Sequence, residues 1–164
     1  VCNVAVSGQT IANLDTNFSG RVVPRYDQSK KLNIYCTIVG TNNTSGGGET
    51  PAATLAALKA YCLKVKGAGY QVIVATQIPR NDGTAGNRDT FNALLRAAYT
   101  EFADGLADIA ADPLLSDFTN TTYFNGDKIH LTAAGNGVAA SRFITEIARL
   151  VEIKTRQRLR GRAA

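Results

Sequence analysis

Residues 32–43 read LNIYCTIVGTNN, a mostly apolar run of strand length that ends in glycine, threonine and two asparagines. Runs of this kind, with little alternation of apolar and polar residues, are typical of strands buried on both faces of a sheet. Glycine and asparagine directly after the run indicate a turn. The stretch therefore predicts a strand over residues 32–39 that brings polar side chains to one edge of a sheet.

Similar apolar runs alternate with helical patterns on both sides of this stretch. The predicted strands cover residues 4–6, 32–39, 70–75 and 106–110. The predicted helices cover residues 51–66, 88–102 and 132 to beyond 150, the last starting at Thr132. Strands that alternate with helices are typical of an α/β protein whose parallel sheet has helices on both faces. In such sheets, ligands bind beyond the carboxyl ends of the strands.

The composition fits one globular domain. The chain has 164 residues, of which 45% are apolar, and no apolar run approaches the length of roughly 18–20 residues that crosses a bilayer. It has no methionine and begins Val-Cys-Asn-Val without a signal-peptide pattern, which favours a processed product or a piece of a longer chain. The residues do not fix the compartment, although an extracellular location is slightly favoured.

The cysteines do not predict a metal site. Cys2, Cys36 and Cys62 form no CxxC pair and have no histidine near them in the sequence. We expect Cys36, within an apolar run, and Cys62, on a helical pattern, to be buried.

The net charge of +5 is concentrated at the C-terminus. Residues 151–164 contain five basic residues and one acidic residue, so this segment alone carries +4. No aromatic residue is interleaved with the arginines, so nucleic-acid binding is not favoured, and a solvated helix end is the simpler interpretation. We therefore divide the chain into a domain over residues 1–150 and a basic tail over residues 151–164.

The only histidine in the chain follows an aspartate by three residues, in Asp127-Lys-Ile-His130. A carboxylate beside an imidazole can hold the ring in one tautomer and stabilise the imidazolium, as in serine hydrolases. The alternative is a surface loop whose Thr132 caps the following helix.

Two turns after predicted strands could supply an oxyanion hole. The Asn42 amide and the Gly8 N–H could both donate hydrogen bonds to a developing oxyanion. The alternative is that these residues only make ordinary turns.

Taken together, the segments resemble the SGNH (GDSL-like) hydrolase family over almost the whole chain. Residues 3–8 resemble its second block, residues 40–43 its third and residues 127–130 its fifth, in order and with 34 residues from Gly8 to Asn42 and 88 from Asn42 to His130. Asn43 stands where the family usually has aspartate. The resemblance implies a three-layer α/β sandwich with a parallel, flavodoxin-like sheet. It also implies that Gly8 and Asn42 bind the oxyanion, that His130 is the base and that Asp127 orients it.

The first block of the family, Gly-Asp-Ser, does not occur in these residues. The resemblance implies that a central strand, its helix and the nucleophilic serine are missing from this chain. We expect an upstream segment, or a separate chain, to carry them. Ser7, at a predicted strand end, is the alternative nucleophile.

The expected activity is hydrolysis of carboxylic esters, with acetyl or short acyl esters of carbohydrate as the implied substrates. The resemblance implies no metal and no cofactor. The alternative is a non-catalytic binding or structural module that lacks the nucleophile.

Overall fold

The computed structural model describes residues 1–46 and 48–161 of the chain, and its core is a parallel sheet. The described strands are β1 (Ile34–Thr37), β2 (Gln71–Ala75) and β3 (Gly105–Ala107), in the spatial order β1-β2-β3. Ile34 lies opposite Gln71 across the first pair, and Ile73 lies opposite Gly105 across the second. The predicted α/β class with a parallel sheet is confirmed.

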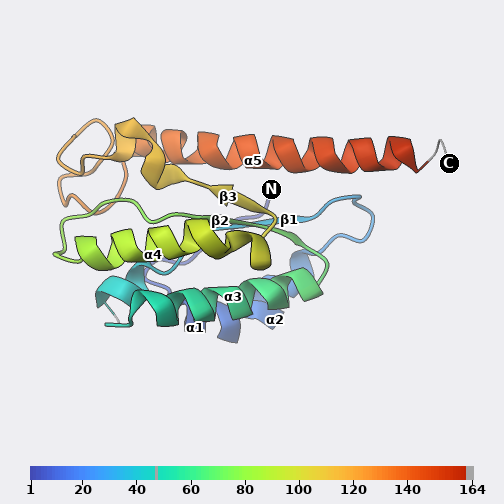
Figure 1. The fold of residues 1–164 in the computed structure, drawn as a ribbon, viewed down its shortest axis with the longest axis horizontal. Coiled ribbons are helices and arrows are strands. Elements are labelled where there is room, and N and C mark those ends of the chain that lie inside the picture. The colour runs from blue at the N-terminus through green and yellow to red at the C-terminus, as the bar shows by residue number, and fades with distance from the viewer. Residues whose placement is uncertain (47, 162–164) are drawn as a thin grey trace.

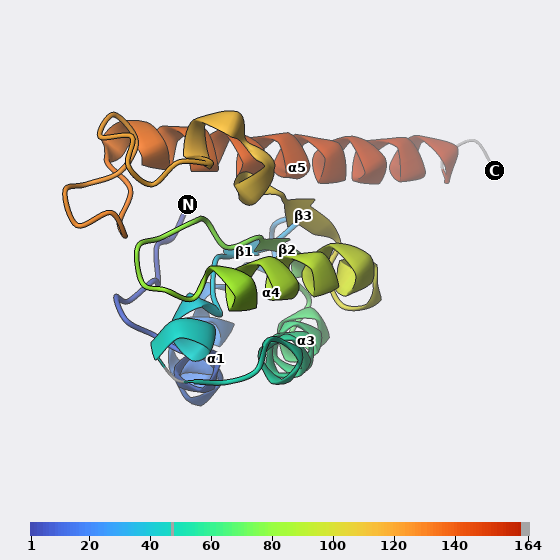
Figure 2. The same ribbon diagram turned by 60° about the vertical axis from the view of Figure 1, so that its left-hand side comes forward.

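Helices cover both faces of the sheet, which gives three layers. The helices are α1 (Ile11–Thr16), α2 (Phe18–Arg21), α3 (Pro51–Gly67), α4 (Ala85–Ala98) and α5 (Ala133–Arg160). The single turns are η1 (Val23–Arg25), η2 (Asn42–Gly46), η3 (Tyr99–Glu101), η4 (Ile109–Ala111) and η5 (Pro113–Leu115). Figure 1 shows α3 and α4 on one side of the sheet and α5 on the other, and Figure 2 shows α1 on the side of α3. None of the described helices is long and apolar enough to span a membrane.

The side chains of β2 alternate between two cores. Val72 and Val74 pack with apolar residues of α3 and α4, whereas Ile73 and Ala75 pack with residues of α5. All four are almost completely buried. This two-sided burial explains why residues 72–75 of β2 are all apolar.

The helix boundaries follow local signals in the sequence. Thr50 caps α3 by accepting a hydrogen bond from the Ala53 N–H at 3.2 Å, and Pro51 occupies the first helical position. Thr132 caps α5 in the same way, accepting from the Gly135 N–H at 3.2 Å. The predicted start of the last helix is therefore confirmed.

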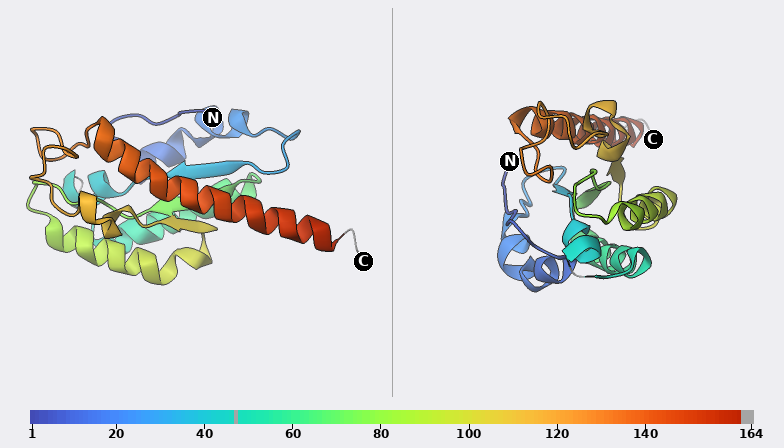
Figure 3. Two further views of the ribbon diagram at one scale, coloured as in Figure 1. Left: turned by 90° about the horizontal axis from the view of Figure 1, so that it is seen from above. Right: turned by 90° about the vertical axis from the view of Figure 1, so that its left-hand side faces the viewer.

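The predicted strand over residues 4–6 is wrong. Residues 1–6 have no regular secondary structure and Val6 is exposed. A cavity of about 750 Å³, here called the edge cavity, lies between this N-terminal segment and β1. The end-on view in Figure 3 shows the segment set apart from the sheet. Without an adjacent strand its backbone has no ladder partner, so the apolar sequence alone does not form a strand.

The expected burial of Cys36 is also wrong, whereas that of Cys62 is confirmed. Cys36 pairs in register with Ile73, whose side chain packs beneath α5. Because α5 packs against β3 and β2, it leaves this part of the edge strand β1 uncovered.

The last turns of α5 project beyond the body of the molecule (Figure 3). The basic residues Lys154, Arg156, Arg158 and Arg160 lie on these exposed turns, and Arg162 falls outside the described residues. The boundary at residue 150 stays a prediction, since α5 runs through it without a break.

The first turn of α5 allows a direct test of packing. A Cβ on Gly135 would lie 2.2 Å from the Tyr123 carbonyl oxygen, whereas a Cβ on Gly137 would meet nothing within 4 Å. We expect Gly135→Ala to lower the free energy of unfolding by about 1–3 kcal/mol. Gly137→Ala should raise it by about 0.5–1 kcal/mol, because alanine favours helix. Denaturant unfolding of both variants measures this, and shifts in the same direction would contradict the packing.

Candidate active site

A cavity of about 310 Å³, here called the site cavity, lies beyond the carboxyl ends of β1 and β2. This is where a parallel α/β sheet is expected to bind its ligand. The segments that follow β1 and β2 line the cavity, together with the Ser7-Gly8 turn and the loop that carries His130. Ser7, Gly8, Asn42 and His130 therefore share one cavity, although they are up to 123 residues apart in the sequence.

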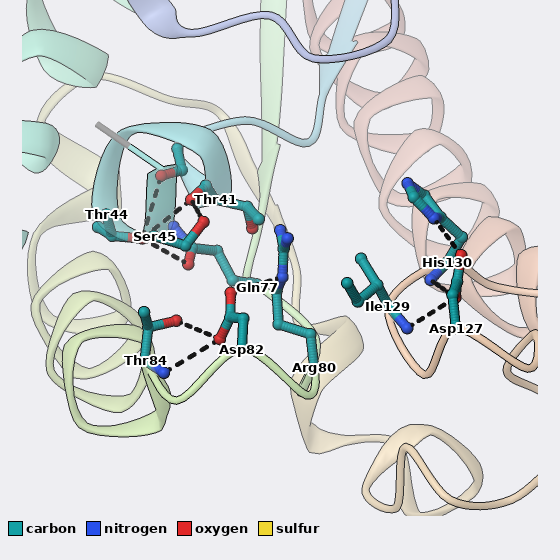
Figure 4. A network of polar contacts seen from close by, with 11 residues as sticks. Thr41, Thr44, Ser45, Gln77, Arg80, Asp82, Thr84, Asp127, Ile129 and His130 are labelled. Carbon is teal, nitrogen blue, oxygen red and sulfur yellow. Dashed lines mark hydrogen bonds and ion pairs between the residues drawn. The ribbon is translucent and has the colours of Figure 1, made fainter. Parts of the chain in front are cut away.

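His130 and Asp127 form the expected pair. The His130 Nδ1 lies 2.7 Å from the Asp127 Oδ2 (Figure 4). The other oxygen, Oδ1, accepts hydrogen bonds from the backbone N–H groups of Ile129 at 2.9 Å and His130 at 3.0 Å. The imidazole is 70% exposed, so its Nε2 edge is open to a reacting group. This geometry holds the ring in the tautomer whose Nε2 can accept a proton.

These contacts lower the pKa of the Asp127 carboxyl to about 2. The largest cause is the hydrogen bond from the His130 backbone N–H, followed by the His130 ring and then the Ile129 N–H. All three stabilise the ionised carboxylate. Asp127 is therefore a permanent anion near neutral pH, as a group that orients an imidazole must be.

Backbone hydrogen bonds brace the loop that carries His130. The Asn125 N–H donates to the His130 carbonyl at 2.8 Å, and Lys128 occupies a left-handed conformation with φ 58°. The Asn81 N–H donates to the Lys128 carbonyl at 3.0 Å, which joins this loop to the segment after β2. The position of His130 is thus tied to the sheet.

Asn42 and Gly8 both lie at the cavity, where the oxyanion hole is expected. The Asn42 Nδ2 donates to the Gln9 carbonyl at 3.1 Å, which fixes the amide beside the Ser7-Gly8 turn. An amide carries two N–H groups, so one donor of Asn42 is left for a ligand. Gly8 has φ 74°, a conformation that glycine adopts without strain.

Asn43, where the family usually has aspartate, is a structural residue here. Its side chain is 1% exposed. Its Oδ1 accepts from the Ile11 N–H at 3.1 Å, and its Nδ2 donates to the Glu49 Oε1 at 2.9 Å. Asn43 therefore connects the first turn of α1 to the segment after β1. An amide suits this position because it can donate a hydrogen bond to the Glu49 carboxylate, which an aspartate could not do.

Two further side chains of the cavity, Gln77 and Arg80, were not assigned roles from the sequence. Figure 4 shows Arg80 extending between Gln77 and Ile129. The Gln77 backbone is held by Asn92, whose amide accepts from the Gln77 N–H and donates to the Gln77 carbonyl, both at 2.8 Å. The polar turn after a predicted strand was the available signal, but it did not show which side chain points inward.

Ser7 is the one serine among the described residues that line the site cavity. It lies there with His130, and its role stays a prediction. No cluster of three or more histidine, cysteine, aspartate or glutamate side chains suited to a metal ion occurs in residues 1–46 and 48–161.

The contact between Asn43 and Glu49 predicts the effect of restoring the usual residue of the family. Asn43→Asp would place a carboxylate beside the Glu49 carboxylate and remove a donor, so we expect a loss of about 1–3 kcal/mol in unfolding free energy. The double variant Asn43→Asp/Glu49→Gln should recover most of it, because glutamine can donate to Asp. A single variant as stable as the parent would contradict this role.

The hydrogen bonds of Asp127 predict its titration. Because its pKa is lowered from the ordinary value of about 3.9, its ionised form stabilises the fold above about pH 4. That contribution is lost as the pH falls through a pKa of about 2. The ¹³Cγ resonance of Asp127 should titrate with a midpoint near 2, and the midpoint should rise only partly in His130→Ala, which keeps the backbone donors. A midpoint at the ordinary value in the parent would refute the assignment.

Comparison with solved structures shows the fold that this site belongs to. A carbohydrate esterase family 3 protein from Talaromyces cellulolyticus is similar over 89% of this chain and 70% of its own, with 18% identity and a TM-score of 0.70. A variant of an acetyl-xylooligosaccharide esterase from Geobacillus is similar over 90% of this chain and 71% of its own, with 18% identity and a TM-score of 0.69. These similarities show the SGNH-hydrolase fold.

Comparison at the level of sequence adds the family. A search of curated proteins gave no match. The model of the GDSL-like lipase/acylhydrolase family matches residues 1–138, which include the Ser7-Gly8 turn, Asn42 and the Asp127/His130 pair. The chain therefore belongs to the GDSL-like lipase/acylhydrolase family.

Proposed function

We propose that this protein hydrolyses carboxylic esters by the serine mechanism, with acetyl or short acyl esters of carbohydrate as substrates. The observation that carries the proposal is the pair of His130 Nδ1 and Asp127 Oδ2, 2.7 Å apart, at a cavity that also contains Gly8 and Asn42. A base with its orienting carboxylate and two oxyanion donors are the groups that acyl transfer needs, apart from the nucleophile. The family and the two esterases of similar fold support a general esterase function.

In this mechanism His130 moves the protons. Its Nε2 takes the proton of a serine hydroxyl while the serine oxygen attacks the ester carbonyl carbon. The Gly8 N–H and the free N–H of the Asn42 amide bind the resulting oxyanion. The imidazolium then protonates the departing alcohol, and a water molecule activated by the same ring hydrolyses the acyl-serine. Asp127 stays ionised throughout.

We propose that the serine comes from an upstream segment that occupies the edge cavity as an added strand. β1 is the edge of the described sheet, so its outer backbone groups lack a ladder partner there. Gly8, Gln9, Ile38, Val39 and Asn42 line both the edge cavity and the site cavity, so the two are contiguous. A strand beside β1 would therefore end next to the proposed oxyanion hole, which is where a nucleophile must stand.

Ser7 remains the alternative nucleophile, since it lies at the same cavity as His130. Two considerations favour the upstream segment. No hydrogen bond joins Ser7 to His130 among the described residues, and use of Ser7 would leave β1 without a neighbour on its outer edge. A non-catalytic binding module is the second candidate function, favoured by the absence of a Gly-Asp-Ser sequence from the chain.

Hydrolysis of p-nitrophenyl acetate and of an acetylated xylo-oligosaccharide by the full-length protein tests the proposal. His130→Ala should lower kcat/KM by at least about 10³-fold, because it removes the group that transfers the proton. Asp127→Asn should lower it by about 10³–10⁴-fold, because an amide at this position favours the wrong tautomer of the His130 ring. Ser7→Ala should retain activity. Unfolding curves serve as the control for folding, and equal activity of the parent and His130→Ala would overturn the enzyme assignment.

A fluorophosphonate ester locates the nucleophile directly, because it leaves a stable adduct on an activated serine. Mass spectrometry of the digested full-length protein should find the adduct on a peptide upstream of Val1. An adduct on Ser7 would instead identify Ser7 as the nucleophile. No adduct, together with no ester hydrolysis, would support the binding module.

A further inference from the structure

One wall of the site cavity carries an arginine guanidinium, whose Nε is paired with Asp82. Arg80 is the only lining residue among those described that is charged at every pH near neutrality, and no carboxylate lines the cavity with it. In Figure 4 its guanidinium extends into the space between Gln77 and Ile129. The terminal N–H groups of this guanidinium favour a ligand that carries negative charge or several acceptor oxygens.

Asp82 contacts the Arg80 side chain at its Nε. This Nε lies 2.7 Å from the Asp82 Oδ2, and the two side chains are only 19% and 16% exposed. The other oxygen of Asp82 accepts from the Thr84 N–H at 3.0 Å and from the Thr84 hydroxyl at 2.5 Å. Asn81, which lies between Arg80 and Asp82 in the sequence, donates a backbone hydrogen bond to the Lys128 carbonyl in the loop that carries His130. Arg80 is thus positioned relative to the proposed catalytic base before any ligand arrives.

The outer edge of the guanidinium is left for a ligand. Asp82 contacts Nε, and neither terminal nitrogen of Arg80 hydrogen-bonds to a residue in the part of the chain that the structure describes. Two parallel N–H groups on a planar edge match the two oxygens of a carboxylate. A neutral hydroxyl group could accept from only one of them at a time.

Gln77 supplies a second, independent sign of a missing acceptor. Its side chain is 6% exposed, and its Nε2 is buried without a hydrogen-bond partner among the described residues. Its Oε1 lies 3.3 Å from the Thr44 hydroxyl oxygen, which also lies within 3.3 Å of the Gly40 and Thr41 carbonyl oxygens. Buried donors in native structures are normally paired, so an unpaired one beside a cavity points to a ligand.

We propose that Arg80, with Gln77 beside it, binds a carboxylate on the substrate, so that the site prefers esters that carry an acidic group close to the scissile bond. An O-acetyl ester of a hexuronic acid is a substrate of this chemistry. The site cavity of about 310 Å³ has room for a group of that size. This inference rests on the proposed ester hydrolysis for its substrate, but not for the binding of the acid itself.

Paired substrates test the preference in the full-length protein. The kcat/KM for an acetyl ester of glucuronate should exceed that for the matching acetyl ester of glucose by at least about tenfold at low ionic strength, and the ratio should fall as salt is added. Arg80→Gln should bring the ratio close to one, and Arg80→Lys should give an intermediate ratio. Arg88→Gln is the matched control, because Arg88 is similarly shielded and paired with Asp89 but does not line the cavity. It should keep the parental ratio.

Binding of glucuronate, measured by NMR titration against glucose, separates this inference from the proposed function. Glucuronate should bind at least about tenfold more tightly than glucose to the parent and to Arg88→Gln, but not to Arg80→Gln. If this pattern holds while no ester is hydrolysed, the acid site stands and the enzyme assignment fails. If esters are hydrolysed but neither preference exists, or Arg80→Gln keeps both, the acid site is overturned and the enzyme assignment stands.

Discussion

The burial of β2 on both faces is the constraint on which the rest of the molecule depends. Val72 and Val74 on one face and Ile73 and Ala75 on the other require a helical layer on each side of the sheet. These two layers cover the faces of the sheet, so its carboxyl edge is left open. The segment after β2 therefore emerges, with polar residues, beside the segment after β1, and the site cavity forms where they meet.

Much of this fold could be predicted from the sequence because its signals are local. Thr50 and Thr132 cap helices through contacts three residues along the chain, and the apolar residues 72–75 of β2 indicate its burial directly. The predictions for residues 4–6 and for Cys36 were wrong for a common reason. A strand needs a neighbour and a buried face needs a cover, and neither can be seen in the residues of the segment itself.

In the candidate site, too, local contacts could be predicted from the sequence and contacts formed by folding could not. Asp127 and His130 could be placed together from the sequence because three residues separate them, and the structure brings them into contact. The role of Asn43 could not be predicted, because its partner Ile11 lies 32 residues away in the sequence. The orientation of the Arg80 side chain toward the cavity could not be predicted either, because it depends on the contact with Asp82 and on the fold of the segment after β2. The prediction was limited by contacts that depend on how the segments fold together, rather than by the chemistry of the residues.

The open edge of β1 in the described sheet bears on self-association as well as on the proposed active site. An unpaired strand edge offers a row of backbone donors and acceptors to any extended peptide, including another copy of the same molecule. A partner that completes the sheet competes with such self-association for the same hydrogen bonds. In the arrangement proposed above, the added strand would form these hydrogen bonds itself, so the same contacts would cover the edge of β1 and place the nucleophile.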